Sequence, residues 1–165
     1  MKEEEHGKRG KAVRESVSFI LYLIVIVVLT FLMIRYVGQR TRVDGSSMEN
    51  TLTNGDNLIV DKISYRFHEP ERFDIIVFPY QYKEDTYFIK RIIGMPGETV
   101  QITDKGEILI NGEELVESYG REVIKDPGLA SDPITLGEDE YFVMGDNRNY
   151  SKDSRFPDVG NIRRA

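Results

Sequence analysis

The chain has 165 residues, of which 22 are basic and 28 acidic, giving a formal net charge of −6, and it contains two histidines and no cysteine. The absence of cysteine excludes disulfides, thiolate catalysis and cysteine-based zinc sites, and two unclustered histidines make a transition-metal site an unfavourable interpretation. Residues 39–165 hold 16 basic and 24 acidic side chains, so they lack the basic surface that nucleic-acid binding needs, and we expect no nucleic-acid partner.

Two segments precede the polar part of the chain. Residues 1–15 carry five basic and four acidic side chains, which predicts a disordered, solvated tail. Residues 16–34 contain no charged side chain, and at about 1.5 Å per residue they reach close to the roughly 30 Å of a hydrocarbon core. We predict an uncleaved transmembrane helix over residues 16–36, because no small-x-small cleavage site follows the apolar run.

The distribution of basic residues around this span predicts its orientation. Five basic residues precede the span, and Arg35, Arg40 and Arg42 follow it closely. The excess on the N-terminal side places residues 1–15 in the cytoplasm as a tail. Residues 37–165 then form an extracytoplasmic β-rich domain of a single-pass protein of the cell membrane.

After the span the hydrophobic pattern changes to period two, which is typical of strands. Turn-forming residues such as Gly and Pro separate the runs. This pattern predicts a mainly β fold, an antiparallel β-sheet domain preceded by one transmembrane helix. Residues 117–140 show no clear period, and we interpret them as a long surface loop. The predicted strands are Asn57–Ile63, Asp74–Phe78, Thr86–Ile93, Thr99–Thr103, Glu107–Ile110 and Tyr141–Met144.

Ser47 is the candidate nucleophile, within Gly45-Ser46-Ser47-Met48. A serine hydroxyl is a weak nucleophile until a base removes its proton. The usual base is histidine, but His6 precedes the apolar span and His68 lies in a charged turn. A lysine base is therefore the alternative to consider. A simple turn or helix cap remains the competing interpretation of the two serines.

Lys90 is the candidate base. Strand alternation places it on one face of its strand between Phe88 and Ile92. Large apolar neighbours disfavour the ammonium form and lower the pKa of a lysine from about 10.4, as a general base near neutral pH requires. The competing interpretation is an exposed lysine on an edge strand, with its stem lying along the sheet.

The third candidate segment is the polar run Gly145–Arg155, which follows a hydrophobic strand. Its Asn, Asp, Ser and Arg side chains can hydrogen-bond one another densely. A calcium loop is rejected because Arg148 and Tyr150 occupy positions that require oxygen ligands. A connecting loop without particular pairing is the competing interpretation.

Together these segments resemble the type I signal peptidases, in the bacterial form with a single N-terminal anchor. The resemblance covers nearly the whole chain in order, and its last two motifs are highly specific. It rests on Gly45-Ser46-Ser47-Met48 with Thr51-Leu52, on Gly55-Asp56 with Val60, on Tyr87–Gly97, and on Gly145–Asn149 with Ser151 and Asp153-Ser154-Arg155.

The resemblance implies a serine endopeptidase with a serine–lysine dyad. Ser47 would be the acylating nucleophile and Lys90 its general base, and Ser151 would hydrogen-bond and orient the amine of Lys90. The backbone N–H of Ser47 would supply one oxyanion donor. No metal and no cofactor would take part.

The resemblance also implies supporting roles. Asp153 would form an ion pair with Arg91 or Arg155 and buttress the loop, and Met48 would pack against the substrate or the membrane surface, with plain core packing as the alternative. Some members carry a second oxyanion hydroxyl where this chain has Gly45, so the second donor is open.

The implied substrates are exported preproteins, whose signal peptides would bind as an added strand. Membrane lipid and the protein export machinery are the other expected partners. Two departures bear on this: Asn50 stands where the family usually has proline, and members generally continue into a further strand beyond the last motif. A catalytically idle, membrane-anchored binding module of the same fold is the alternative, and a self-cleaving serine–lysine repressor is disfavoured by the span.

Overall fold

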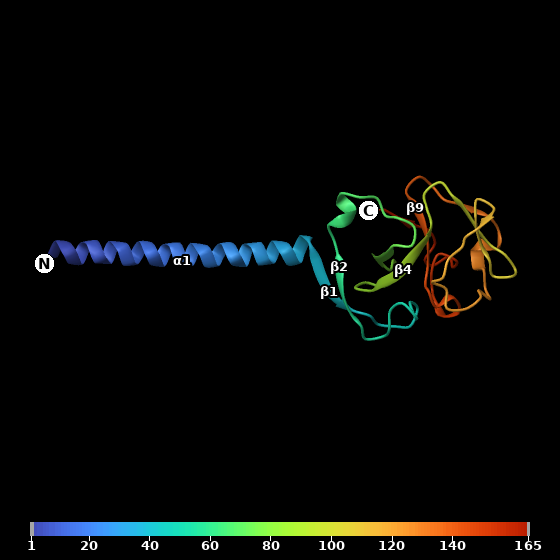
Figure 1. Ribbon diagram of the computed structural model, residues 1–165, viewed down its shortest axis with the longest axis horizontal. Coiled ribbons are helices and arrows are strands. Elements are labelled where there is room, and N and C mark those ends of the chain that lie inside the picture. Colours follow the sequence, from blue (N-terminus) through green and yellow to red (C-terminus); the bar gives the residue numbers. More distant parts are fainter. Residues whose placement is uncertain (1, 165) are drawn as a thin grey trace. The chain divides into compact units, whose positions relative to one another are not determined.

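The computed structural model describes residues 2–164, with the side chains of residues 14–164. Met1, where the predicted tail begins, and Ala165, where the predicted β-rich domain ends, lie outside the described residues. The chain forms two compact units. One contains the residues up to Arg40 together with Ile59–Phe67, and the other contains Thr41–Leu58 and the residues from His68 onward. Figure 1 traces the chain from helix α1 through β1 and β2 to the later strands.

Helix α1 spans Lys2–Tyr36 and includes the predicted span. Within the described residues, Arg14–Tyr36 is the one helical stretch long and apolar enough to cross a membrane, with a mean hydropathy of 3.0. The helix begins at Lys2, so the prediction of a disordered tail over residues 1–15 is wrong for its described part. The tail is rich in Glu, Lys and Arg, which favour helix, and it extends a helix whose costly nucleation the apolar segment already provides.

A two-stranded sheet follows α1. Strand β1, Gly38–Arg42, was not predicted, and it pairs with β2, Asn57–Asp61. A short 3₁₀ helix, η1, at Ser64–Arg66 follows β2. Strand β1 could not be predicted from hydrophobic periodicity, because its Gln, Arg and Thr residues are all polar and produce no alternation of apolar and polar side chains.

A four-stranded antiparallel sheet carries Lys90, in the order β10-β9-β4-β3. Strand β4 is an interior strand, with β3 on one side and β9 on the other; Figure 1 labels β4 and β9. The three predicted strands of this sheet are confirmed within one residue at each end. Its strands are β3 at Ile75–Pro79, β4 at Tyr87–Gly94, β9 at Glu140–Met144 and the unpredicted β10 at Ile162–Arg163.

A second antiparallel sheet has the order β7-β6-β5-β8. The mainly β, antiparallel fold class predicted for residues 37–165 is therefore confirmed. Two of its strands were predicted. Its strands are β5 at Thr99–Ile102, β6 at Ile108–Ile110, β7 at Glu113–Glu114 and β8 at Ile134–Thr135.

The sheet that carries Lys90 has a hydrophobic cluster on each face, because successive side chains of a strand point to opposite sides. Ile93 belongs to a cluster shared with the second sheet, and Ile92 belongs to the other cluster. Gly94 permits the close approach of the two sheets, since a Cβ there would lie 2.5 Å from the side chain of Val100. The β4–β9 pairing is irregular at the same point.

The segment 117–140 is only partly the surface loop that we predicted. Ile124, Ala130 and Leu136 are buried in the cluster between the sheets, and β8 pairs with β5. A 3₁₀ helix, η2, spans Gly128–Ser131. The segment inserts single apolar side chains from irregular backbone, and such isolated insertions produce no periodic pattern.

Candidate active site

Ser47 and Lys90 lie within hydrogen-bond distance. The amine nitrogen Nζ of Lys90 is 2.9 Å from Oγ of Ser47 and 2.9 Å from the carbonyl oxygen of Ile89. Ser47 belongs to a tight turn that follows β1, in which Gly45 has φ +114°, a conformation that favours glycine. Lys90 lies in the middle of β4, opposite Ile76 of β3. The turn and the central strand thus bring together two residues 43 positions apart.

Lys90 is buried, with 3% of its surface exposed. Its amine lies 5.0 Å from the centroid of the Phe88 ring, and Ile92 is fully buried beside it. Burial lowers the pKa of Lys90 to about 8, while the negative charges of Asp153 and Asp146 act in the opposite direction. The exposed edge-strand interpretation is therefore wrong, because β4 has a neighbour on each side.

Asn147 holds the backbone of the serine turn. Its backbone N–H donates to the carbonyl oxygen of Ser47 at 3.0 Å, and its side-chain Nδ2 donates to the carbonyl oxygen of Ser46 at 3.0 Å. Asn147 is 2% exposed, and it precedes the 3₁₀ helix η3 at Arg148–Tyr150. Sequence reasoning did not single out this residue, because a backbone contact across 100 residues leaves no local signal.

Ser151 does not make the hydrogen bond to Lys90 that we predicted. Its Oγ is buried and has no hydrogen-bond partner among the described residues. The second bond of the Lys90 amine goes to the carbonyl of Ile89 instead. Ser151 packs against Gly145, where a Cβ would lie 2.2 Å from the serine Oγ. The spacing of the motif could not distinguish these two arrangements of the hydroxyl.

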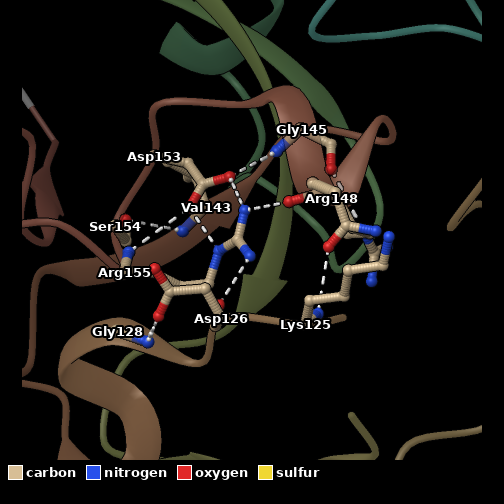
Figure 2. A network of polar contacts seen from close by, with 10 residues as sticks. Lys125, Asp126, Gly128, Val143, Gly145, Arg148, Asp153, Ser154 and Arg155 are labelled. Atoms are coloured by element: carbon tan, nitrogen blue, oxygen red, sulfur yellow. Dashed lines mark hydrogen bonds and ion pairs between the residues drawn. The ribbon is translucent and has the colours of Figure 1, made fainter. Parts of the chain in front are cut away.

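Asp153 pairs with Arg155 and not with Arg91. Nε of Arg155 lies 2.8 Å from Oδ1 of Asp153, and both side chains are at most 1% exposed. The backbone N–H of Gly145 donates to Oδ2 of Asp153, and Arg155 also donates to the carbonyls of Arg148 and Asp126 (Figure 2). The pair therefore connects both ends of the polar run to a neighbouring loop.

Arg91 pairs with Asp146, a partner that the sequence did not predict for it. Nη2 of Arg91 lies 2.7 Å from Oδ2 of Asp146, and Nε lies 2.9 Å from Oδ1, so the contact is bidentate. The hydroxyl of Thr51 donates to the same carboxylate, and the guanidinium lies 3.7 Å from the centroid of the Tyr119 ring. This buried pair joins β4 and the end of β9 to the turn that contains Ser47.

The Ser47 turn and β4 line a pocket of about 360 Å³. Met48 is 2% exposed and lines this pocket, so its side chain packs within the protein. Gly45 also lines it, with no atom within 4 Å of the position that a Cβ would occupy. Within the described part of the chain, no cluster of three or more His, Asp or Glu side chains could hold a metal ion. The lining residues are Thr41–Met48, Val77, Tyr87–Lys90, Tyr150 and Lys152.

Replacing Gly145 by alanine should displace the serine turn. A Cβ at this position would lie 2.4 Å from the backbone oxygen of Ser47 and 2.2 Å from Oγ of Ser151, so backbone must move. We expect a loss of about 1–3 kcal/mol in the free energy of unfolding. Gly38→Ala, at a glycine without positive φ where the nearest atom to a Cβ lies at an ordinary contact distance of 3.4 Å, tests whether the Gly145 effect arises from contact with Ser47. Comparable urea midpoints for the two variants, with unchanged turnover in Gly145→Ala, would contradict it.

A family model described as "Signal peptidase, peptidase S26" matches residues 15–165. A signal peptidase I from Leptolyngbya laminosa is 44% identical over 128 residues, which are 73% of this chain and 61% of that protein. A signal peptidase I from Bacillus licheniformis is 36% identical over 162 residues, which are 94% of this chain and 84% of that protein. A crystal structure of a signal peptidase I from Enterococcus faecalis V583 is 34% identical, covers 58% of this chain and 91% of its own, and has a TM-score of 0.45.

The chain thus spans less than two thirds of the length of the relative from Leptolyngbya laminosa and more than four fifths of the one from Bacillus licheniformis. The family model covers nearly all of the described residues, from the start of the apolar helix stretch to the end of the chain. By this match, the chain belongs to the signal peptidase family of the peptidase S26 type.

Proposed function

We propose that this chain is a membrane-anchored serine endopeptidase that removes signal peptides from exported preproteins. The observation that carries the proposal is the 2.9 Å contact between Nζ of Lys90 and Oγ of Ser47. A nucleophile within hydrogen-bond reach of its base is the geometry of covalent acyl transfer. The signal peptidase I relatives support the choice of substrate.

The first half of the reaction forms an acyl-enzyme. Neutral Lys90 accepts the hydroxyl proton as Oγ of Ser47 attacks the scissile carbonyl carbon, and negative charge develops on the carbonyl oxygen. The Ser47 backbone N–H serves as one donor to this oxyanion. The Lys90 ammonium then gives its proton to the departing amine, the peptide C–N bond breaks, and the mature protein leaves with a new N-terminus.

The second half releases the signal peptide. Lys90, neutral again, takes a proton from a water molecule that attacks the ester carbonyl of the acyl-enzyme. The ester C–O bond breaks, the proton returns to Oγ of Ser47, and the signal peptide leaves with a free carboxylate. The carbonyl of Ile89, which accepts from the Lys90 amine, keeps the lone pair of that amine in a fixed direction through both halves.

Membrane attachment forms part of the proposal. The apolar stretch Arg14–Tyr36 supports a single span, and the excess of basic residues before it supports a cytoplasmic N-terminus. The proposed organisation is a tail over residues 1–15, a signal anchor over 16–36 and an extracytoplasmic peptidase domain over 37–165. Membrane lipid and the export machinery would then be neighbours of the enzyme.

The pH dependence of cleavage should follow the ionisation of Lys90. The lysine acts as a base only when neutral, and burial lowers its pKa to about 8. We therefore expect kcat/KM to rise about tenfold per pH unit below pH 8 and to level off above it. Steady-state cleavage of a fluorogenic peptide between pH 6 and 10 measures this. A rate that is flat across the range, or falls as the pH rises through 8, would contradict a lysine base.

Cleavage of a preprotein by the full chain in detergent tests the proposed function itself. We expect the wild-type chain to release a mature protein by cutting directly after a small residue. The Ser47→Ala variant should release no product. A chain that is folded by circular dichroism and binds the preprotein without cutting it would instead support an idle binding module. Mass spectrometry of the products distinguishes these two results.

A further inference from the structure

A second lysine, Lys152, lines the same pocket as Ser47 and Lys90. Its Nζ donates to the hydroxyl of Tyr80 at 3.0 Å and forms an ion pair with Asp158. The side chain of Lys152 is 49% exposed and that of Asp158 is 35% exposed. Lys152 is thus a pocket cation whose counterion remains in contact with solvent.

Two stacked rings connect this cation to the dyad. Nζ of Lys152 lies 5.2 Å from the centroid of the Tyr80 ring, and that ring stacks on Phe88 at 4.5 Å. The other lysine, Lys90, lies 5.0 Å from the centroid of Phe88. At about 3.3 Å per residue of extended peptide, a side chain that reaches Lys152 belongs to a residue at most about four positions from the cleaved bond.

Lys152 retains capacity for a ligand. An ammonium group has three N–H donors, and among the described residues its acceptors are Asp158 and Tyr80. An exposed ion pair contributes little to stability, so a second carboxylate can join or replace Asp158 at small cost. Apart from the two lysines, the charged residues of the pocket wall are Arg42 and Asp44. These two have opposite charges and lie two positions apart in the chain. Lys152 is therefore the pocket cation best placed to select an anion.

We propose that Lys152, oriented by Tyr80 and Asp158, is a specificity-determining residue that binds an acidic side chain of the substrate near the cleaved bond. The inference rests on the proposed function, since it presupposes a peptide in the pocket. It narrows the substrate class to preproteins that carry Asp or Glu at one position within a few residues of the cleavage point. Electrostatic complementarity of this kind discriminates between partners more than it increases overall affinity.

A series of cleavable peptides that differ only in the position of one charged residue tests the inference. Glu, Gln or Lys is placed at each of four positions on either side of the cleaved bond, and kcat/KM is measured for the full chain in uncharged detergent, without anionic lipid. At one position we expect Glu to exceed Gln by about two- to fivefold, in line with an exposed pair. The preference should disappear in Lys152→Ala, and Lys152→Glu should favour the Lys peptide at that same position.

Two further variants sharpen the test. Asp158→Asn removes the competing carboxylate and should increase the preference for Glu. Lys105→Glu makes the same charge change at an exposed turn outside the pocket and should leave the preference as in the wild type. If peptides are cut but Lys152→Glu keeps the wild-type charge preference, or Lys105→Glu changes it equally, the inference is wrong. If the wild type cuts none of the peptides, the proposed function itself has failed.

Discussion

Replacing Lys90 by methionine should abolish cleavage while leaving the fold intact. Methionine is unbranched and can fill the buried position of Lys90 between Phe88 and Ile92, but its thioether sulfur is too weakly basic to accept the Ser47 proton. Removing one member of a nucleophile–base pair costs on the order of 10³-fold or more in kcat. The measurement is single-turnover cleavage at pH 9, where the wild-type lysine is largely neutral.

The stability of the same variant separates lost chemistry from lost structure. Because burial lowers the pKa of Lys90, the folded state binds this proton more weakly than the unfolded state. The lysine therefore destabilises the fold below pH 8, and the penalty fades as the pH rises toward 10.5. Lys90→Met should be at least as stable as the wild type at pH 7. Lys105→Met, at an exposed turn, is the matched control and should retain full activity. Substantial residual cleavage by folded Lys90→Met would rule out this base.

Replacing Asp153 by alanine should give the second large effect, on stability. Its loss leaves the fully buried guanidinium of Arg155 without a counterion and removes the acceptor of the Gly145 N–H. Breaking a buried pair from one side costs about 3–5 kcal/mol, because an uncompensated charge remains. Urea denaturation of the full chain in detergent, followed by near-ultraviolet circular dichroism, measures this loss. Cleavage should fall with it, since Gly145 packs against the backbone of Ser47.

A surface pair provides the contrast for that prediction. Arg163 pairs with Glu140 at 3.0 Å, but its side chain is 71% exposed. Arg163→Ala should cost about 0–1 kcal/mol, as solvent replaces the lost partner. The double variant Asp153→Ala with Arg155→Met removes both buried charges and should recover part of the lost stability. Equal losses in Asp153→Ala and Arg163→Ala would show that the buried pair has no special role.

Much of the candidate site could be predicted from the chain because its motifs, taken together, resemble those of the type I signal peptidases. Because neither His6 nor His68 suits a catalytic role, a lysine was the candidate base for Ser47. The alternation around Lys90 was compatible with a desolvated lysine but left an exposed one open, and the resemblance to the family made the choice. The predicted strands agree with β2 to β6 and β9 because their apolar side chains alternate. By contrast, β1, β8 and β10 are short or polar and pair at positions far away in the chain, so their local sequence contains no such signal.

The amino-acid sequence alone therefore determined the apolar helix and the β class, since both follow from local composition and periodicity, whereas the pairing of Ser47 with Lys90 was expected from the family resemblance. Only the tertiary structure decided the partners around them. Asn147 donates hydrogen bonds to the carbonyl oxygens of Ser46 and Ser47, and Asp146 forms the ion pair with Arg91. The hydroxyl of Ser151 makes no hydrogen bond to Lys90, which it was expected to orient. The contacts of Asn147 and Asp146 join residues 55 to 101 positions apart. Which of several chemically equivalent donors meets an acceptor over such a separation depends on sheet register and close packing at Gly145, and neither is encoded in a local pattern.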